Sequence, residues 1–126
     1  MKVIIAGPRD FFRRQELEQA IADALTEGIE ITEVVSGKAR GVDTMGEDWA
    51  VANGIPIKGF PADWKKHGKS AGFLRNRQMA EYGEALIALS YCPNPSPGTS
   101  NMIREAKNKN LKVHVHKIRR SSDAGS

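Results

Sequence analysis

The segment "VVSGKARGVDTMGEDWA", residues 34–50, begins as an apolar strand and ends as an amphipathic helix. The turn between the two contains Gly37, Arg40, Gly41 and Asp43. A strand that passes through a short turn directly into a helix is the unit from which parallel α/β sheets are built. Two interpretations of the turn are open: a tight structural turn, or a cradle in which backbone N–H groups at the start of the helix bind a phosphate.

The same alternation of strand and helix continues along the chain. The predicted strands are the short apolar runs at residues 2–7, 31–37, 55–60, 85–90 and 112–118. Between them apolar residues recur at helical spacing, as in the stripe Leu17, Ala20, Ile21, Ala24 and Leu25 that stops before Gly28. This pattern predicts a single-domain α/β fold, with a five-stranded parallel sheet flanked by helices on both faces. Strand 1 is expected at the centre, with the chain reversing direction between strands 1 and 4.

The composition is that of one folded domain. The 126 residues are 40% hydrophobic and 27% charged, which is typical of globular rather than disordered or membrane-embedded proteins. No apolar run approaches the roughly 18–20 residues that cross a bilayer, and the single Cys92 excludes an internal disulfide. These features predict a cytoplasmic protein without a membrane partner, with one domain over residues 2–118 and a disordered tail over 119–126.

The formal charge of +4 suits an anionic partner but does not name one. The late basic residues, from Arg104 to Arg120, are divided among a helix, a strand and the tail, so they need not form one face. Aromatic side chains that could stack on single-stranded nucleic acid are also few. We therefore expect nucleic-acid binding to be weak at most and to be lost near physiological salt. Homo-oligomerisation is left open.

Ligands in such sheets bind beyond the carboxyl ends of the strands, where the chain reverses direction. The turns at these ends are "GPRDF" (7–11), "SGKARGVD" (36–43) and "SYCPNPSPGT" (90–99). Arg9 and Arg40 can each grip a phosphate through two parallel hydrogen bonds. Asp10 and Thr99 are candidate N-caps of the helices that follow, and Asp43 can cap its helix or accept a hydrogen bond from a ribose. Three such turns at adjacent strand ends favour a shared anionic ligand.

Three other patterns do not support further sites. The sequence "HGKS" (67–70) looks like the end of a phosphate-binding P-loop, but Asp63 stands where that motif needs a glycine. No G-x-G-x-x-G follows strand 1, which disfavours ordinary NAD binding. His114 and His116 face the same side of a predicted strand, without a third ligand nearby in the sequence. We therefore expect no metal ion and no cofactor.

The segment from Ser70 to Tyr82 is a predicted helix that carries two arginines and an asparagine in succession. Arg75, Asn76 and Arg77 fan over about 200° of a helix, so they cannot all face the sheet. Arg75 shares a face with Met79 four residues later, and we expect it to point inward.

The stretches "AGPRDF", "VVSGKARGVDTMGEDWA", "FPADWKKHGKSAGFLRNRQMA" and "PGTSNMIREA" resemble, in this order, the YspA-like small proteins of the SLOG superfamily. That superfamily is named for the DNA-processing protein A and the Lonely guy phosphoribohydrolases. The likeness covers roughly residues 2–116. It implies a Rossmann-like sheet whose glycine-bearing loops bind a nucleotide or a nucleotide-derived ligand.

The phosphoribohydrolase branch cleaves the base from a nucleoside monophosphate, and its signature pairs an Arg before a Met with a "PGG-x-GT-x-x-E" loop. Here "RNRQM" resembles the first part and places Arg75 at the arginine position. "SPGTSNM" resembles the second part in Gly98 and Thr99, but Met102 stands at the glutamate position. A carboxylate stabilises the oxocarbenium character of such a reaction and methionine cannot. Glu105, one turn later on the same side, is a weak substitute.

We therefore predict a protein that binds a nucleotide or a nucleotide-derived phosphorylated ligand, as a sensor or a processing module. The predicted ligand-binding residues are Gly7, Arg9, Ser36, Gly37, Arg40, Gly41, Asp43, Arg75, Asn76, Gly98 and Thr99. The alternative is an N-glycosidic hydrolase of the phosphoribohydrolase type, with Arg75, Asp43 and Glu105 as its catalytic residues. Single-stranded DNA binding is the third hypothesis, and whether the protein is an enzyme stays open from the sequence.

Overall fold

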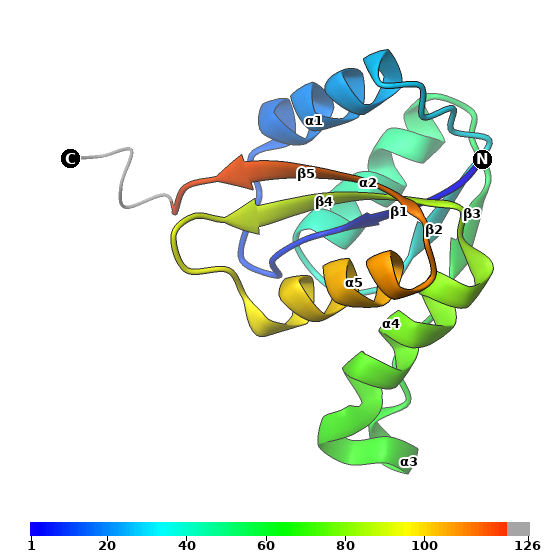
Figure 1. The fold of residues 1–126 in the computed structure, drawn as a ribbon, viewed down its shortest axis with the longest axis vertical. Coiled ribbons are helices and arrows are strands. Elements are labelled where there is room, and N and C mark those ends of the chain that lie inside the picture. Colours follow the sequence, from blue (N-terminus) through cyan, green and yellow to red (C-terminus); the bar gives the residue numbers. More distant parts are fainter. Residues whose placement is uncertain (121–126) are drawn as a thin grey trace.

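The structure, a computed structural model, describes residues 1–120 and has an α/β fold with one five-stranded sheet (Figure 1). The strands are β1 (Lys2–Ala6), β2 (Glu33–Ser36), β3 (Ile57–Gly59), β4 (Ala85–Tyr91) and β5 (Lys112–Ile118). The helices are α1 (Arg14–Thr26), α2 (Val42–Ala52), α3 (Trp64–His67), α4 (Ala71–Tyr82) and α5 (Pro97–Asn108). All strand pairs are parallel in the order β3-β2-β1-β4-β5, which confirms the predicted sheet and the reversal between β1 and β4. Within residues 1–120, no helix is both long and apolar enough to span a membrane.

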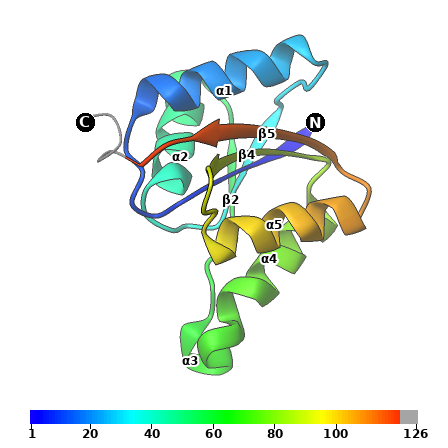
Figure 2. The ribbon, with the colours of Figure 1, turned by 60° about the vertical axis from the view of Figure 1, so that its left-hand side comes forward.

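The core consists of two apolar layers, one on each face of the sheet (Figures 1 and 2). α1 and α2 cover one face, where Ile5, Ile21 and Ile87 are buried. α4 and α5 cover the other face, over Ile4 and Leu86. Consecutive residues of a strand point to opposite faces, so β1 and β4 supply side chains to both layers. Every residue of β4 is buried, as expected for a strand that is covered on both sides.

The first helix departs from two details of its prediction. Arg13 occupies the N-cap of α1, so the expected Asp10 cap is wrong. The Asp10 carboxylate instead accepts a hydrogen bond from the Tyr91 hydroxyl at 2.8 Å. Leu25 is 46% exposed, although it was expected in the buried stripe. The reason is geometric, since Leu25 lies about 100° around the helix from Ala24, which faces the sheet.

The segment between β3 and α4 forms a projection that extends away from the sheet (Figures 1 and 2). It contains α3 and a 3₁₀ turn at Gly68–Ser70, neither of which follows from the apolar spacing of the sequence. Asp63 begins the projection, because its carboxylate accepts a hydrogen bond from the Lys66 N–H at 3.1 Å and so caps α3. α3 also packs against the start of α4, which brings Trp64 to the carboxyl edge of the sheet.

The chain beyond β5 returns toward the start of α1. The Arg119 carbonyl accepts a hydrogen bond from the Arg13 guanidinium. The Arg120 guanidinium lies 3.7 Å from the Asp10 carboxylate and 4.2 Å from the centre of the Tyr91 ring. Residues 119 and 120, which the sequence assigns to the tail, are thus in contact with the folded domain. The rest of the predicted tail, residues 121–126, lies outside the described residues.

Candidate functional site

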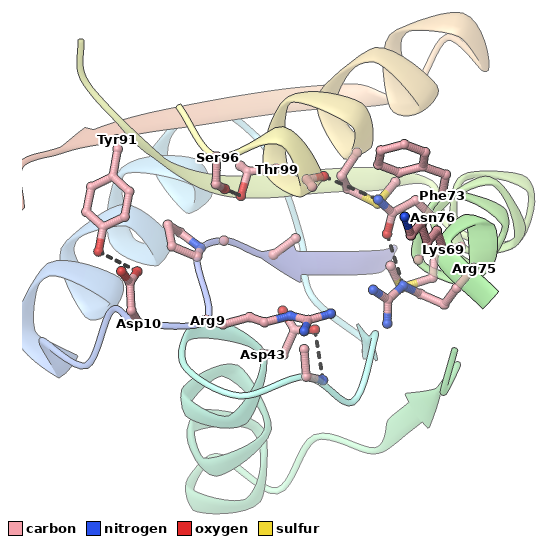
Figure 3. Close-up of a pocket in the computed structure, with 18 of the residues that line it drawn as sticks. Arg9, Asp10, Asp43, Lys69, Phe73, Arg75, Asn76, Tyr91, Ser96 and Thr99 are labelled. Atoms are coloured by element: carbon pink, nitrogen blue, oxygen red, sulfur yellow. Dashed lines mark hydrogen bonds between the residues drawn. The ribbon is translucent and has the colours of Figure 1, made fainter. Parts of the chain in front are cut away.

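A cavity of about 480 Å³ opens at the carboxyl edge of the sheet, where β1 and β4 end (Figure 3). Its walls come from the turn after β1, the turn before α2, the α3–α4 segment and the start of α5. It is lined by Ala6, Gly7, Pro8, Arg9, Asp10, Ala39, Asp43, Trp64, Lys69, Gly72, Phe73, Arg75, Asn76, Met79, Tyr91, Ser96, Gly98, Thr99, Met102 and Arg120. The volume is typical of small-molecule sites, which span about 300–1,000 Å³. Its position at the reversal point is the one that the topology favours.

The cavity brings together most of the predicted ligand-binding residues, from three separate turns and from α4. Those that line it are Gly7, Arg9, Asp43, Arg75, Asn76, Gly98 and Thr99. Gly37 and Arg40 line a second hollow of about 370 Å³, next to the first. Arg9 and Arg75 line both. The exposed Arg40 side chain therefore belongs to the neighbouring hollow and not to the main cavity.

Three predicted site residues lie outside both hollows. The Ser36 hydroxyl donates a hydrogen bond to the Glu47 carboxylate at 2.5 Å and so serves the packing of β2 against α2. Gly41 is buried at the N-cap of α2. The Glu105 carboxylate lies 3.7 Å from Nε of Arg77, which is outside the lining of the cavity. The structure therefore does not bring Glu105 to the place where a catalytic carboxylate would have to act.

Arg75 connects the turn after β2 to the start of α5. One N–H of its guanidinium donates to the Gly37 carbonyl, and its Nε donates to the Asn76 side-chain oxygen at 3.0 Å. The Asn76 amide group in turn donates to the Gly98 carbonyl at 3.3 Å and to the Asn101 side chain at 2.8 Å. Arg75 and Asn76 are both buried, as expected for the inward side of α4. The predicted inward orientation of Arg75 is confirmed.

Gly37 makes this arrangement possible because it has no side chain. A Cβ at this position would lie 2.7 Å from Nη1 of Arg75 and 2.9 Å from Oδ2 of Asp43. Real Cβ atoms do not approach other heavy atoms this closely, so a larger residue would displace one of the two side chains. The guanidinium and the carboxylate thus meet across a position that only glycine leaves open.

Asp43 is a carboxyl group that the fold removes from water. Burial raises its pKa from the usual 3.8 to about 6. The Ala39 N–H, which donates to Oδ2 at 3.3 Å, and the positive charges of Arg75 and Arg9 oppose this rise only in part. The same burial lowers the pKa of Arg75, while the charge of Asp43 raises it. A carboxyl group with a pKa near 6 can exchange a proton close to neutral pH, which is a property of general acids and bases.

The turn after β2, the predicted phosphate cradle, uses much of its hydrogen-bonding capacity within the protein. The Ala39 N–H donates to Asp43, and the Val42 N–H donates to the Pro8 carbonyl at 3.2 Å. Gly41 has a φ of 72°, and a Cβ there would lie 2.4 Å from the Pro8 oxygen. Gly41 therefore allows the turns after β1 and β2 to pack together. These N–H groups are occupied and do not face the cavity as free donors.

The start of α5 offers backbone N–H donors that have no partner among the described residues. Its N-cap is Ser96 and its first residue is Pro97, so the predicted Thr99 cap is wrong. Pro97 starts the helix earlier because its fixed φ suits the first helical position. The Ser96 hydroxyl donates to the Thr99 hydroxyl at 2.8 Å. Among the described residues, the N–H groups of Gly98 and Thr99 have no hydrogen-bond partner, and a Cβ at Gly98 would meet nothing within 4 Å.

The charges around the cavity are mainly positive. The ionisable groups that line it as bases are Arg9, Lys69, Arg75 and Arg120, and those that line it as acids are Asp10 and Asp43. Asp10 lies next to Arg120, and Asp43 lies next to Arg75. The four basic groups outnumber the two acidic groups, so the lining keeps a net positive charge. Sequence reasoning missed Lys69, whose only signal was the "HGKS" stretch, and Arg120, which lies in the predicted tail.

The outer wall of the cavity is aromatic. Trp64 and Phe73 line it from the projection and from α4, and about half of each side chain is exposed. The Arg9 guanidinium carbon lies 5.5 Å from the centre of the Trp64 ring, within the range of a cation–π contact. Large, half-exposed aromatic rings beside a cavity are typical of surfaces that bind a ligand or a partner.

Known proteins that share this sequence pattern identify the family. The sequence profile of the YspA, cpYpsA-related SLOG family matches residues 1–67, and the Gene 61 protein of Mycobacterium phage D29 is 36% identical over 119 residues. The chain belongs to the YspA, cpYpsA-related SLOG family. The alignment with the phage relative covers 89% of this chain and 93% of the relative. No solved structure matches the chain. Membership in the SLOG family suggests, at the level of the family, binding or processing of nucleotide-related ligands.

We expect the stability of this SLOG protein to depend on pH through Asp43. The pKa of about 6 in the folded state lies above the usual 3.8, so the folded protein holds this proton more tightly. The protonated Asp43 therefore stabilises the folded state. This contribution to the free energy of unfolding is complete below about pH 4 and is lost as the pH rises through about 6. A shift of about two pKa units corresponds to roughly 3 kcal/mol.

Urea unfolding of the wild type and of Asp43→Asn, at several values from about pH 4 to 7, measures this effect. Between these limits the free energy of unfolding should fall by about 2–3 kcal/mol more in the wild type than in the variant. Other titrating groups are common to both proteins and cancel in the difference. Curves that run parallel over the whole range would show that Asp43 titrates in the folded protein as it does in the unfolded chain.

Proposed function

We propose that the protein binds a nucleotide or a related phosphorylated metabolite in the cavity at the carboxyl edge of the sheet. The observation that carries this proposal is the buried guanidinium of Arg75, which lines the cavity beside the open start of α5. A guanidinium has five N–H donors, and Arg75 uses two of them in hydrogen bonds to Gly37 and Asn76. The other three donors of this buried cation have no partner in the part of the chain that the structure describes, so they are available to an anionic ligand.

The phosphate of the ligand would lie at the start of α5. The N–H groups of Gly98 and Thr99 have no partner there among residues 1–120, and the partial positive charge of the helix N-terminus adds to their attraction for an anion. Arg75 is tied to this place through Asn76, whose amide group donates to the Gly98 carbonyl. The open space around Gly98 gives a phosphate room to approach the backbone. This location replaces the turn after β2, where the N–H groups of Ala39 and Val42 are used inside the protein.

The remaining parts of a nucleotide have partners on the other walls. A base can stack on Trp64 or Phe73, an interaction worth about 1–3 kcal/mol in other nucleic-acid-binding proteins. A sugar hydroxyl can donate to Oδ1 of Asp43, because Oδ2 is the oxygen that accepts from Ala39. Arg9 lies between the two regions, next to Trp64 and lining both hollows. The cavity thus offers a partner to each chemical part of a nucleoside phosphate.

Binding should depend on Arg75 and not on its neighbour Arg77. We expect nucleoside mono-, di- or cyclic phosphates to raise the Tm of the wild type in a concentration-dependent way. Hydrogen bonds to charged groups contribute about 1.5–3 kcal/mol, so Arg75→Ala should weaken binding by roughly 10- to 100-fold. Arg75→Lys keeps the charge, loses the planar fork, and should also bind less tightly. A thermal-shift screen followed by isothermal titration calorimetry measures both effects.

Arg77→Ala is the matched control for this experiment. Arg77 is two residues away on α4, its side chain is 60% exposed, and its partner is Glu105 rather than the cavity. It should bind like the wild type, and Arg40→Ala should have a smaller effect than Arg75→Ala because Arg40 lines only the neighbouring hollow. If no nucleotide shifts the wild type, or if Arg75→Ala keeps full affinity, the proposal is wrong.

One observation favours a second candidate function, hydrolysis of the N-glycosidic bond. Asp43 supplies a buried carboxyl group with a raised pKa to the same cavity, and such a group can activate water or stabilise positive charge on a sugar. Against it, Met102 lines the cavity at the position of the glutamate in the phosphoribohydrolase signature. The candidate catalytic carboxylate is therefore Asp43 rather than Glu105.

The two functions differ in what happens to the nucleotide. If the protein is a hydrolase, free base should accumulate from a nucleoside monophosphate, and Asp43→Asn should reduce the rate at least about 100-fold, as for loss of a general acid or base. Glu105→Gln should keep the rate, because Glu105 lies outside the cavity. Chromatography of the incubated mixture measures base release. If the nucleotide stays intact after prolonged incubation with concentrated protein, the protein binds nucleotides without hydrolysing them. If base release is lost in Glu105→Gln but not in Asp43→Asn, Glu105 is the catalytic carboxylate instead.

A further inference from the structure

Asp23, His114 and His116 form a group of potential metal ligands on the α1 side of the sheet. Each offers one ligand atom, and the three atoms lie within 4.8 Å of one another. The two histidines are two residues apart on β5, so both lie on the same face of the strand, and Asp23 is a half-buried residue of α1. α1 lies beside β5 in both ribbon views (Figures 1 and 2). The group is separate from the nucleotide cavity, whose lining contains none of these residues.

His114 has the orientation of a metal-binding histidine. Its Nδ1 lies 2.8 Å from Oε1 of Glu27, while its Nε2 is buried and has no hydrogen-bond partner among the described residues. A buried ring nitrogen without a partner is unfavourable unless something occupies it. In metal sites, a histidine that binds through one nitrogen nearly always hydrogen-bonds a carboxylate or a carbonyl through the other. Glu27 provides this second interaction and leaves Nε2 as the free ligand atom.

Asp23 is also fixed in position. Its Oδ1 accepts a hydrogen bond from the Gln19 side chain at 2.8 Å, one turn earlier on α1. Among residues 1–120 its other oxygen has no hydrogen-bond partner, so it can serve as a ligand atom. Sequence spacing offers no third ligand close to His114 and His116, because Asp23 is about ninety residues away and only the packing of α1 on β5 brings it near.

We propose that Asp23, His114 and His116 bind a divalent transition-metal ion, with Zn²⁺ as its representative. Imidazole and carboxylate suit such ions, which bond to nitrogen and oxygen at about 2.0–2.2 Å. Rotation of the three side chains would draw their ligand atoms together around one ion. Three protein ligands leave one position of a tetrahedral ion for water or for a small ligand. The bound ion would also fasten α1 to the edge strand β5.

The test uses the full chain after removal of any histidine tag, and titrates it with ZnCl₂. Isothermal titration calorimetry should give saturable binding of one ion, and Zn²⁺ should raise the Tm because the ligands are brought together only in the folded protein. Co²⁺ in place of Zn²⁺ should give a visible absorption band from nitrogen and oxygen coordination. His116→Ala and Asp23→Asn should each raise the Kd more than tenfold and abolish the rise in Tm.

Two further variants separate this site from general binding by surface histidines. His67 is the remaining histidine of the chain and is exposed on α3, so His67→Ala should bind Zn²⁺ like the wild type. Glu27→Gln keeps all three ligands but weakens the interaction that orients His114, and should raise the Kd about tenfold. The absence of saturable binding would overturn the proposal. So would an unchanged Kd in both His116→Ala and Asp23→Asn, or a loss of binding in His67→Ala.

Discussion

The buried guanidinium of Arg75 holds together the carboxyl edge of this sheet. It contacts the turn after β2 through the Gly37 carbonyl and reaches the start of α5 through Asn76. Burial alone would disfavour the charged guanidinium, and the nearby charge of Asp43 offsets this in part. Burying a cation whose remaining N–H donors have no partner among the described residues costs free energy that a structural role alone does not explain. An anionic ligand in the adjoining cavity would account for its presence.

Three glycines of these turns have different roles, although they look alike in the sequence. Gly41 lets two turns pack against each other, and Gly37 makes room for a guanidinium and a carboxylate. Gly98 alone has open space around it, beside N–H groups that have no partner among the described residues. Of the two interpretations of the "SGKARG" turn, the structure supports the tight structural turn. It is a tight structural turn, and it supports the cavity by positioning Asp43 and Arg75.

Much of the fold could be predicted from the sequence because local patterns determine it. Apolar runs of strand length alternate with helical stripes, and the rules of parallel sheets then fix the strand order and the edge at which the turns meet. The inward position of Arg75 followed from its spacing to Met79. The misplaced details depend on contacts between distant residues. Asp10 binds Tyr91 instead of capping α1, and Asp23 meets two histidines of β5 only after the chain has folded.

The central claim is that one ligand site is formed where the turns after β1 and β4 meet Arg75. A titration of ¹⁵N-labelled protein with a nucleoside phosphate, followed by amide NMR, tests it most directly. The account predicts that the largest shifts occur at the amides of Gly98 and Thr99 and at the Arg75 side chain, with smaller shifts at Gly7 and Arg9. Amides of α1 and β5 should not move. Shifts that gather on another face of the protein, or that leave Gly98 and Thr99 unchanged at saturation, would contradict the account.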